Sequence, residues 1–370
     1  MAVSEAQSKG ITMSGGGLYS LATTGAKDVI DTATPLVLDA INALPQASLN
    51  GGFTISDMGC ADAGTSLTMI GKAIDAVSNR APSTPVTVVY TDQPRNDFNA
   101  LITNVYGLGP FETYLDKTDN VYPLVSGTSF YRQIMPSNSL NLGFSATAMH
   151  WLSNKVCNIS NHVQAIGAEG AELKAFQDQA HNDWRNILLH RASELKPGGK
   201  LVLINFGTDD QRRYLGNTGG INMFDTFNAI WLSFVDQNRI TREEYENMTL
   251  PQYYNSVEEF SAPLINPEEA VYKAGLRLDH IDTGIVKCPF AEDFRRHGDA
   301  QKFSEAYIPT IRSWNESIFF NALASERPVD QRREIIEDYY NTYKAMVRDN
   351  PEGHGMDYVH AYTVISKVVS

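Results

Sequence analysis

The stretch "FTISDMGCADAGTS", residues 53–66, decides the fold class of this 370-residue chain. It begins with a short apolar run that ends at Asp57, a pattern typical of a buried strand. Gly59 and Gly64 follow in a turn that opens a helical pattern at 67–80. Glycines in such a turn let backbone amides approach a ligand closely. The stretch therefore predicts a ligand site at a strand end, although a plain strand-to-helix turn has the same pattern.

Strand-like runs recur along the first half of the chain at spacings that leave room for helices, at 85–93, 138–146 and 199–207. One of the intervening helical patterns, at 183–199, stops at Pro-Gly-Gly. Strands that alternate with helices in this way predict an α/β fold with a mainly parallel sheet, covered by helices on both faces.

After residue 207 the pattern becomes mostly helical, with strand-like runs only at 275–288 and 357–370. We expect these helices to form a cap over the strand ends. The predicted division of the chain is a lid segment at 1–30, an α/β core at 31–207, a mainly helical cap at 208–330 with the inserted strand, and a C-terminal helix and strand at 331–370 that complete the sheet.

Composition excludes several classes of partner. The chain has 30 basic and 43 acidic residues, a net charge of −13, and no basic run, so we expect neither nucleic acid nor an anionic membrane surface as a partner. It has no uninterrupted apolar run of about 18 residues, and its beginning lacks the apolar segment of a signal peptide. Three scattered cysteines fit a reducing compartment, so we expect a cytosolic protein.

The next strand adds a second acid. The run "VTVVYTDQP" ends at Asp92, and an acid at the end of the second strand is where a carboxylate binds a ribose diol. Dinucleotides and S-adenosylmethionine both carry this diol. The turn after Asp57 lacks the G-x-G-x-x-G triplet that receives a pyrophosphate, because Cys60, Ala61 and Ala63 occupy it. A cofactor without phosphate fits this turn better.

Four segments together resemble a known family: "ISDMGCADAGTS", "YTDQPRNDFNAL", "GTSFYRQIMPSNSLNLGFSATAMHWLS" and "LLHRASELKPGGKLVLINFG". In order and spacing they are similar to the motifs of the SABATH methyltransferases, a family of carboxyl methyltransferases that also includes N-methyltransferases. The resemblance implies a Rossmann-like class I methyltransferase sheet with an antiparallel last strand, S-adenosylmethionine as cofactor, and a homodimer.

The resemblance assigns cofactor contacts residue by residue. Asp57 and Gly59 are expected at the methionine end, Asp92 at the ribose, and Ser145 beside the sulfonium. The remaining contacts are Tyr19 in a lid that follows three glycines, Gln93 near the adenine, and Ser129 and Phe130 as the adenine clamp, with the Phe130 ring stacked on the base.

The resemblance also assigns the substrate pocket. Trp151 inherits the family tryptophan that donates its indole N–H to the substrate carboxylate, and His150 is a second candidate for the same pocket; for Trp151 the alternative is ordinary core packing. The family's second carboxylate anchor, a glutamine, aligns with Ala26, so the identity of the acid is open. The other expected pocket residues are Thr147, Phe224, Trp231, Ile308, Ile311 and Trp314, and for the last five the alternative is ordinary core packing.

The predicted reaction is methyl-ester formation on a small carboxylic acid, with aromatic acids among the candidates. Such an acid is already ionised at neutral pH, so positioning is sufficient and no catalytic base or Mg²⁺ is required. We expect no metal site. Three alternatives stay open: methylation of a nitrogen or a phenol, a nicotinamide-dependent oxidoreductase, and a non-catalytic cofactor-binding relative.

Overall fold

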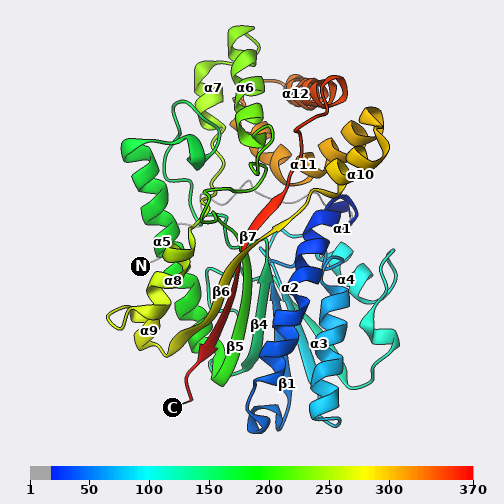
Figure 1. The fold of residues 1–370 in the computed structure, drawn as a ribbon, viewed down its shortest axis with the longest axis vertical. Coiled ribbons are helices and arrows are strands. Elements are labelled where there is room, and N and C mark those ends of the chain that lie inside the picture. Colours follow the sequence, from blue (N-terminus) through cyan, green and yellow to red (C-terminus); the bar gives the residue numbers. More distant parts are fainter. Residues whose placement is uncertain (1–17, 370) are drawn as a thin grey trace.

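The computed structural model describes the backbone of residues 18–369 and the side chains of residues 20–369 (Figure 1). Its centre is a seven-stranded sheet in the order β3-β2-β1-β4-β5-β7-β6. Neighbouring strands are parallel except for the two pairs that β7 forms. This confirms the predicted α/β fold with an antiparallel last strand. The strands are β1 Phe53–Met58, β2 Val86–Thr91, β3 Val121–Ser126, β4 Leu140–Ala146, β5 Leu195–Phe206, β6 Leu276–Val286 and β7 Tyr358–Lys367.

Helices cover both faces of the sheet (Figure 1). Alternate residues of β5 point to opposite faces, since side chains alternate along a strand. Val202 and Ile204 join the apolar cluster that includes residues of α2 and α3, whereas Leu201 and Leu203 join the cluster that includes α5. The helices of these two layers are α2 Thr24–Asn42, α3 Leu67–Arg80 and α4 Phe98–Val105 on one side, and α5 Gly170–Glu194, α8 Val257–Ile265 and α9 Ala270–Lys273 on the other.

The remaining helices gather above the carboxyl ends of the parallel strands (Figure 1). α12 packs against α11 and α6, and α7 contacts both α6 and α11. Capping boxes at Thr241 and Ser256 fix where α7 and α8 begin. The cap helices are α1 Leu18–Ala22, α6 Met223–Asp236, α7 Arg242–Asn247, α10 Pro289–His297, α11 Ala300–Ala322 and α12 Val329–Asp349; short 3-10 helices occur at Gln46–Leu49, Tyr114–Asp116 and Ala165–Gly167.

The structure differs from the sequence-based division at two places. α8 and α9, expected in the cap, contact β6 and α5, so they belong to the layer that covers the sheet. α12, expected beside the sheet, lies in the cap. The other boundaries remain a proposal.

The helix predicted at 183–199 also ends earlier than expected, at Glu194. β5 starts at the next residue, because Leu195 already pairs with Leu140. The pairing then jumps to Leu142 and Lys200, so the Pro-Gly-Gly residues form an irregular part of the strand and do not end a helix.

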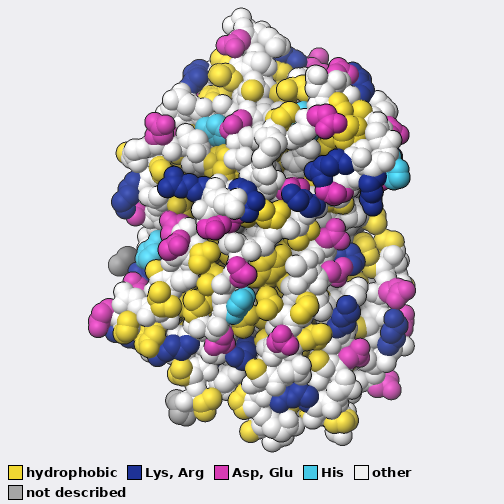
Figure 2. All heavy atoms as spheres, in the orientation of Figure 1, with side chains coloured by type: hydrophobic (Ala, Val, Ile, Leu, Met, Phe, Trp, Pro, Cys, Tyr) yellow, Lys and Arg dark blue, Asp and Glu magenta, His cyan; other side chains and the backbone are white. Residues whose placement is uncertain are grey.

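Acidic and basic side chains alternate over the face shown in Figure 2. Several basic side chains of the protein have acidic partners, including Lys200 with Asp279 at 2.8 Å and Lys287 with Asp357 at 2.8 Å. Within residues 18–369, no helix combines the length and the apolar character that crossing a membrane requires.

Candidate active site

The turn after β1 adopts backbone conformations that restrict its sequence. Gly59 has a φ of +79°, and a Cβ there would lie 2.5 Å from the Cβ of Ala148, so only glycine fits. Ala61 and Ala63 also have positive φ, at 48° and 62°. Left-handed alanines are strained, and such strain concentrates at functional sites. The contact with Ala148 also brings this turn against the segment that carries His150 and Trp151.

Asp57 ends β1 and is buried. Its carboxylate accepts a hydrogen bond of 2.6 Å from the Ser66 hydroxyl. Burial, partly opposed by this hydrogen bond, raises the pKa of Asp57 to about 7. The cofactor side of the site therefore contains a carboxyl group that titrates close to physiological pH.

Asp92 holds the ends of β1 and β2 together. One carboxylate oxygen accepts from the Ala61 amide at 2.8 Å, and the other accepts from the Gln93 amide at 2.7 Å. Burial raises the pKa of Asp92, and the two amides oppose this shift. Each oxygen of an ionised carboxylate can accept about two hydrogen bonds, so both retain capacity for a ligand hydroxyl.

Ser129 and Phe130 lie in the loop after β3, beside the glycine turn. The Phe130 ring would be 3.6 Å from a Cβ on Gly59. The loop is fixed by Arg191 of α5, whose guanidinium donates to the Phe130 carbonyl at 2.9 Å and the Arg132 carbonyl at 2.8 Å. Glu194 pairs with the same guanidinium at 2.6 Å, and both side chains are fully buried. Sequence reasoning missed this pair, because its motif reads only as a helix end.

The chain turns sharply after β4. Ser145 is buried and its hydroxyl donates to the Met58 carbonyl at 2.7 Å, which leaves its oxygen able to accept. Thr147 has a φ of +57°, which is unusual for a β-branched residue. Its amide donates to the Ile204 carbonyl at 2.8 Å, and its hydroxyl lies 3.2 Å from Nε2 of His360. These contacts hold the strained turn that leads to His150 and Trp151.

A short backbone pairing holds the His-Trp segment. Trp151 forms an antiparallel bridge with Gln252, and the Tyr253 amide donates to the His150 carbonyl at 3.1 Å. The Leu152 amide donates to the Pro251 carbonyl at 2.7 Å. The hydroxyl of Tyr131, from the Phe130 loop, donates to the Trp151 carbonyl. The backbone that carries the two aromatic side chains is therefore held by residues 251–253 and by Tyr131 of the Phe130 loop.

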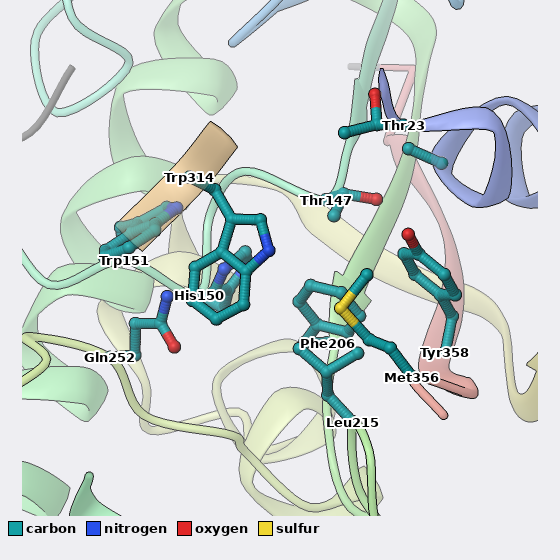
Figure 3. Close-up of a pocket in the computed structure, with 11 residues that line it drawn as sticks. Thr23, Thr147, His150, Trp151, Phe206, Leu215, Gln252, Trp314, Met356 and Tyr358 are labelled. Carbon is teal, nitrogen blue, oxygen red and sulfur yellow. The ribbon is translucent and has the colours of Figure 1, made fainter. Parts of the chain in front are cut away.

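These side chains line a pocket of about 410 Å³, counting the space open to solvent (Figure 3). Its lining is mostly aromatic and apolar and contains no Lys, Arg, Asp or Glu among the described residues. The lining residues are Thr23, Ala26, Thr147, His150, Trp151, Phe206, Leu215, Gln252, Trp314, Met356 and Tyr358.

Four of the predicted substrate residues line this pocket: Thr147, His150, Trp151 and Trp314. The other four do not. Trp231 is fully buried in the cap, where its indole packs edge-on against Phe319 and Tyr339 with ring centroids 5.1 and 5.7 Å away. Phe224, Ile308 and Ile311 are also buried in an apolar cluster and do not line this pocket.

His150 is a neutral group in this pocket. It is buried against Phe206, with ring centroids 4.8 Å apart, and burial lowers its pKa to about 3. Its Nδ1 has no hydrogen-bond partner among the described residues. The imidazole is therefore uncharged at physiological pH.

Sequence reasoning also missed pocket residues that are far apart in the chain. Phe206 could have been found by the strand-end rule, because it is the last residue of β5. Gln252, Leu215 and Met356 lie in irregular segments and have no comparable signal. The side chain of Tyr19 and the glycines before it lie outside the described residues. Within the described part of the chain, no group of three His, Cys, Asp or Glu side chains could hold a metal ion.

Comparisons with known proteins agree with this geometry. The family profile described as "SAM dependent carboxyl methyltransferase" matches residues 9–368. The chain belongs to this family, the SABATH family predicted from its motifs. The expected cofactor, S-adenosylmethionine, is confirmed with it.

Individual relatives are distant. Salicylate carboxymethyltransferase of Clarkia breweri is 24% identical over 341 residues, which is 89% of each chain. Methyltransferase LUC1 of a Fusarium species is 31% identical over 215 residues, 56% of this chain and 55% of that protein, so this match spans about half the length of the relative. A solved structure described as loganic acid methyltransferase with SAH has a TM-score of 0.71 at 20% identity and covers 96% of this chain and 99% of its own. This similarity confirms the fold.

The residues present fit such a cofactor. Only glycine fits at position 59, because a Cβ there would clash with Ala148. Without a side chain, the backbone of this turn can approach a ligand closely. Asp92 retains acceptor capacity for a ribose diol. Asp57 supplies a carboxyl group beside the turn.

Proposed function

We propose that this protein methylates the carboxylate of a small, mostly apolar organic acid and releases its methyl ester. The observation that carries the proposal is the pocket itself: an aromatic, uncharged cavity that begins at Thr147, directly after β4, and includes the Trp151 indole. The contact between Ala148 and the Gly59 turn supports a common site for acid and cofactor.

When bound, S-adenosylmethionine supplies a methyl group on a positively charged sulfur, and transfer of this group to a carboxylate oxygen gives a neutral ester and S-adenosylhomocysteine. The protein does not have to remove a proton, because a carboxylic acid with a pKa near 4 is already ionised. The neutral His150 is consistent with this assignment, since a group with a pKa of about 3 is a weak base.

Trp151 is the proposed donor to the carboxylate. No described residue accepts a hydrogen bond from its indole N–H, although a buried indole usually has such a partner. Its backbone is fixed by the bridge to Gln252, and its side chain lines the pocket. A preorganised donor orients the acid and supplies much of the effective molarity on which a displacement reaction depends.

An uncharged lining suits this reaction. A Lys or Arg in the pocket would stabilise the substrate anion more than the transition state, in which the negative charge on oxygen is being neutralised. Binding of that kind lowers KM without raising kcat. Neutral donors orient the anion and stabilise it less, relative to the transition state, than a cation would.

The lining also restricts the substrate. Leu215, Met356 and Phe206 form an apolar wall, and the described lining has no cation for a second carboxylate. We therefore expect aromatic or branched monocarboxylic acids to react faster than dicarboxylic acids of similar size.

The test is a mass-spectrometric screen with S-adenosylmethionine bearing a deuterated methyl group. The panel contains aromatic, fatty and terpenoid monocarboxylic acids, matched diacids, phenols and xanthines. We expect a gain of one labelled methyl on monocarboxylic acids. Methylation only of phenols or xanthines would refute the proposal in favour of O- or N-methylation, and cofactor binding without any acceptor would favour a non-catalytic role.

We also propose that the protein acts in the cytosol as a homodimer. Its three cysteines are free, which fits a reducing compartment, and the dimer rests on the family resemblance alone. Light scattering on the purified protein and the location of a fluorescent fusion test these two statements. A monomeric mass or a secreted fusion would refute them.

A further inference from the structure

Gln252 lines the substrate pocket with one end of its amide already occupied. The residue is 1% exposed and lies in an irregular segment between α7 and α8. The Tyr254 hydroxyl donates to its Oε1 at 3.0 Å. This hydrogen bond fixes the orientation of the amide, because Oε1 accepts and Nε2 does not.

The amide nitrogen has no acceptor among the described residues. It lies toward Trp151 and His150 in the close-up (Figure 3). Because Oε1 is occupied by Tyr254, the N–H groups are the part of the amide that is available, and a ligand in the pocket that accepts from them gains a hydrogen bond. The antiparallel bridge between Trp151 and Gln252 places these two donors on adjacent strands of backbone.

We propose that Gln252 is the second hydrogen-bond donor to the substrate carboxylate, next to Trp151. This inference rests on the proposed function and deepens it. A carboxylate has two oxygens, and one indole N–H cannot orient both. Ala26, which lines the same pocket, has no side-chain donor. Gln252 supplies one without adding charge, in keeping with the rest of the lining.

Tyr254 is then a positioning residue. Its hydroxyl holds Oε1 away from the carboxylate, so the amide presents only N–H groups to the anion. Without this hydroxyl the amide is free to rotate by half a turn. Its oxygen would then face the carboxylate for part of the time and repel it.

The experiment compares substitutions in the full-length protein with an acid that the wild type methylates. Gln252→Met keeps the length and neutrality of the side chain and removes its donors, and we expect kcat/KM for the acid to fall about tenfold or more, consistent with a lost hydrogen bond to a charged group. Gln252→Glu adds a negative charge, so kcat/KM for the acid should fall further in this variant. The loss of kcat/KM in Tyr254→Phe should be smaller than in either Gln252 variant. The dissociation constant for S-adenosylmethionine should stay within about twofold in all three.

The matched control is Gln237→Glu, which makes the same change at an exposed site after α6 and should leave kcat/KM unchanged. Circular dichroism and thermal unfolding check the fold, and Gln252→Met keeps the test decisive if Gln252→Glu does not fold. Unchanged kcat/KM in a folded Gln252→Met protein, or equal losses of cofactor and acid binding, would overturn the assignment. Failure of the wild type to methylate any acid would instead refute the proposed function.

Discussion

The cofactor side and the substrate side of this site are built differently. The residues that we propose to bind the cofactor lie at the ends of four adjacent strands, β3, β2, β1 and β4, or in the loops after them, within residues 57–145. The substrate pocket takes its lining from separate segments between Thr23 and Tyr358. Parallel strands place their carboxyl ends at one edge, so the sheet fixes the first set. Most of the second set lies on loops and a cap helix, with Ala26 on α2, Phe206 on β5 and Tyr358 on β7, and the loop residues can change without altering the sheet.

The two sides also differ in how many of their polar groups are already hydrogen-bonded within the protein. The carboxylates of Asp57 and Asp92 already accept from groups of the protein. On the substrate side, no described residue pairs with Nδ1 of His150, the indole N–H of Trp151 or Nε2 of Gln252. The carboxylates on the cofactor side are thus held by protein contacts and keep spare acceptor capacity, whereas the substrate side has polar groups with no partner among the described residues.

The largest expected effect tests how firmly the cofactor side is held. Arg191→Met leaves Glu194 buried without its partner and removes the donors to the Phe130 loop. Breaking a buried ion pair in this way should lower the free energy of unfolding by about 3–5 kcal/mol. Denaturant unfolding measures the change.

The control for Arg191 is Arg295→Met, which breaks an exposed pair with Glu292 on α10 at the same i,i+3 spacing and should cost less than about 1 kcal/mol. Similar small losses in both variants would mean that the buried pair does not hold the loop.

The next effect tests the substrate side alone. Trp151→Phe keeps an aromatic wall and removes one donor to a charged group, so kcat/KM for the acid should fall by about 1.5–3 kcal/mol, or roughly ten- to more than a hundredfold. Cofactor affinity should hardly change. The matched Trp231→Phe exchange, in the cap core, should leave kcat/KM near that of the wild type. Equal losses in both variants would show that Trp151 is structural.

A substitution of Asp92 tests the cofactor side alone. Asp92→Asn keeps the shape of the side chain and removes its charge, so S-adenosylmethionine affinity should drop about tenfold through weaker hydrogen bonds to the ribose. The exposed Asp119→Asn is the control. Calorimetric titration measures both. A folded Asp92→Asn protein that binds the cofactor as the wild type does would rule out a ribose contact.

The smallest expected effect separates the two sides by pH. The pKa of Asp57 is raised to about 7, so its carboxyl group ionises between about pH 6 and 8. A positively charged cofactor favours the ionised form, and its affinity should therefore rise several-fold across this range and level off above it. Asp57→Asn should remove the rise. His150, with a pKa of about 3, should add no change over the same range. An equally steep rise in Asp57→Asn would assign it to another group.

The sequence predicts where the cofactor side lies for a physical reason. A strand end, a glycine turn and an acid on the next strand are local patterns, and parallel strands bring their ends together whatever lies between. Arg191 and Glu194 were missed, because a buried ion pair at a helix end has the same sequence pattern as a solvated one. Strand β3 was missed because it lies at the sheet edge, where Tyr122 and Leu124 are each 54% exposed and lack the continuous apolar pattern of a central strand.

The substrate side was predicted only in part. Thr147, His150 and Trp151 follow a core strand, so their position at the strand end could be predicted from the sequence. Phe224 and Trp231 lie on α6, and an aromatic on an amphipathic helix can face either a pocket or the core. The structure resolves this by packing α6 against α12. Gln252 gave no signal, because its role depends on a bridge to a residue about a hundred positions earlier.

The most direct test uses a hydroxybenzoic acid that offers a carboxylate and a phenol in one molecule. The protein is incubated with this acid and S-adenosylmethionine carrying a ¹³C-methyl group, and the product is identified by NMR and by mild alkaline hydrolysis. Methylation of the carboxylate predicts an ester, which releases labelled methanol in alkali. A labelled ether that survives alkali would contradict the account.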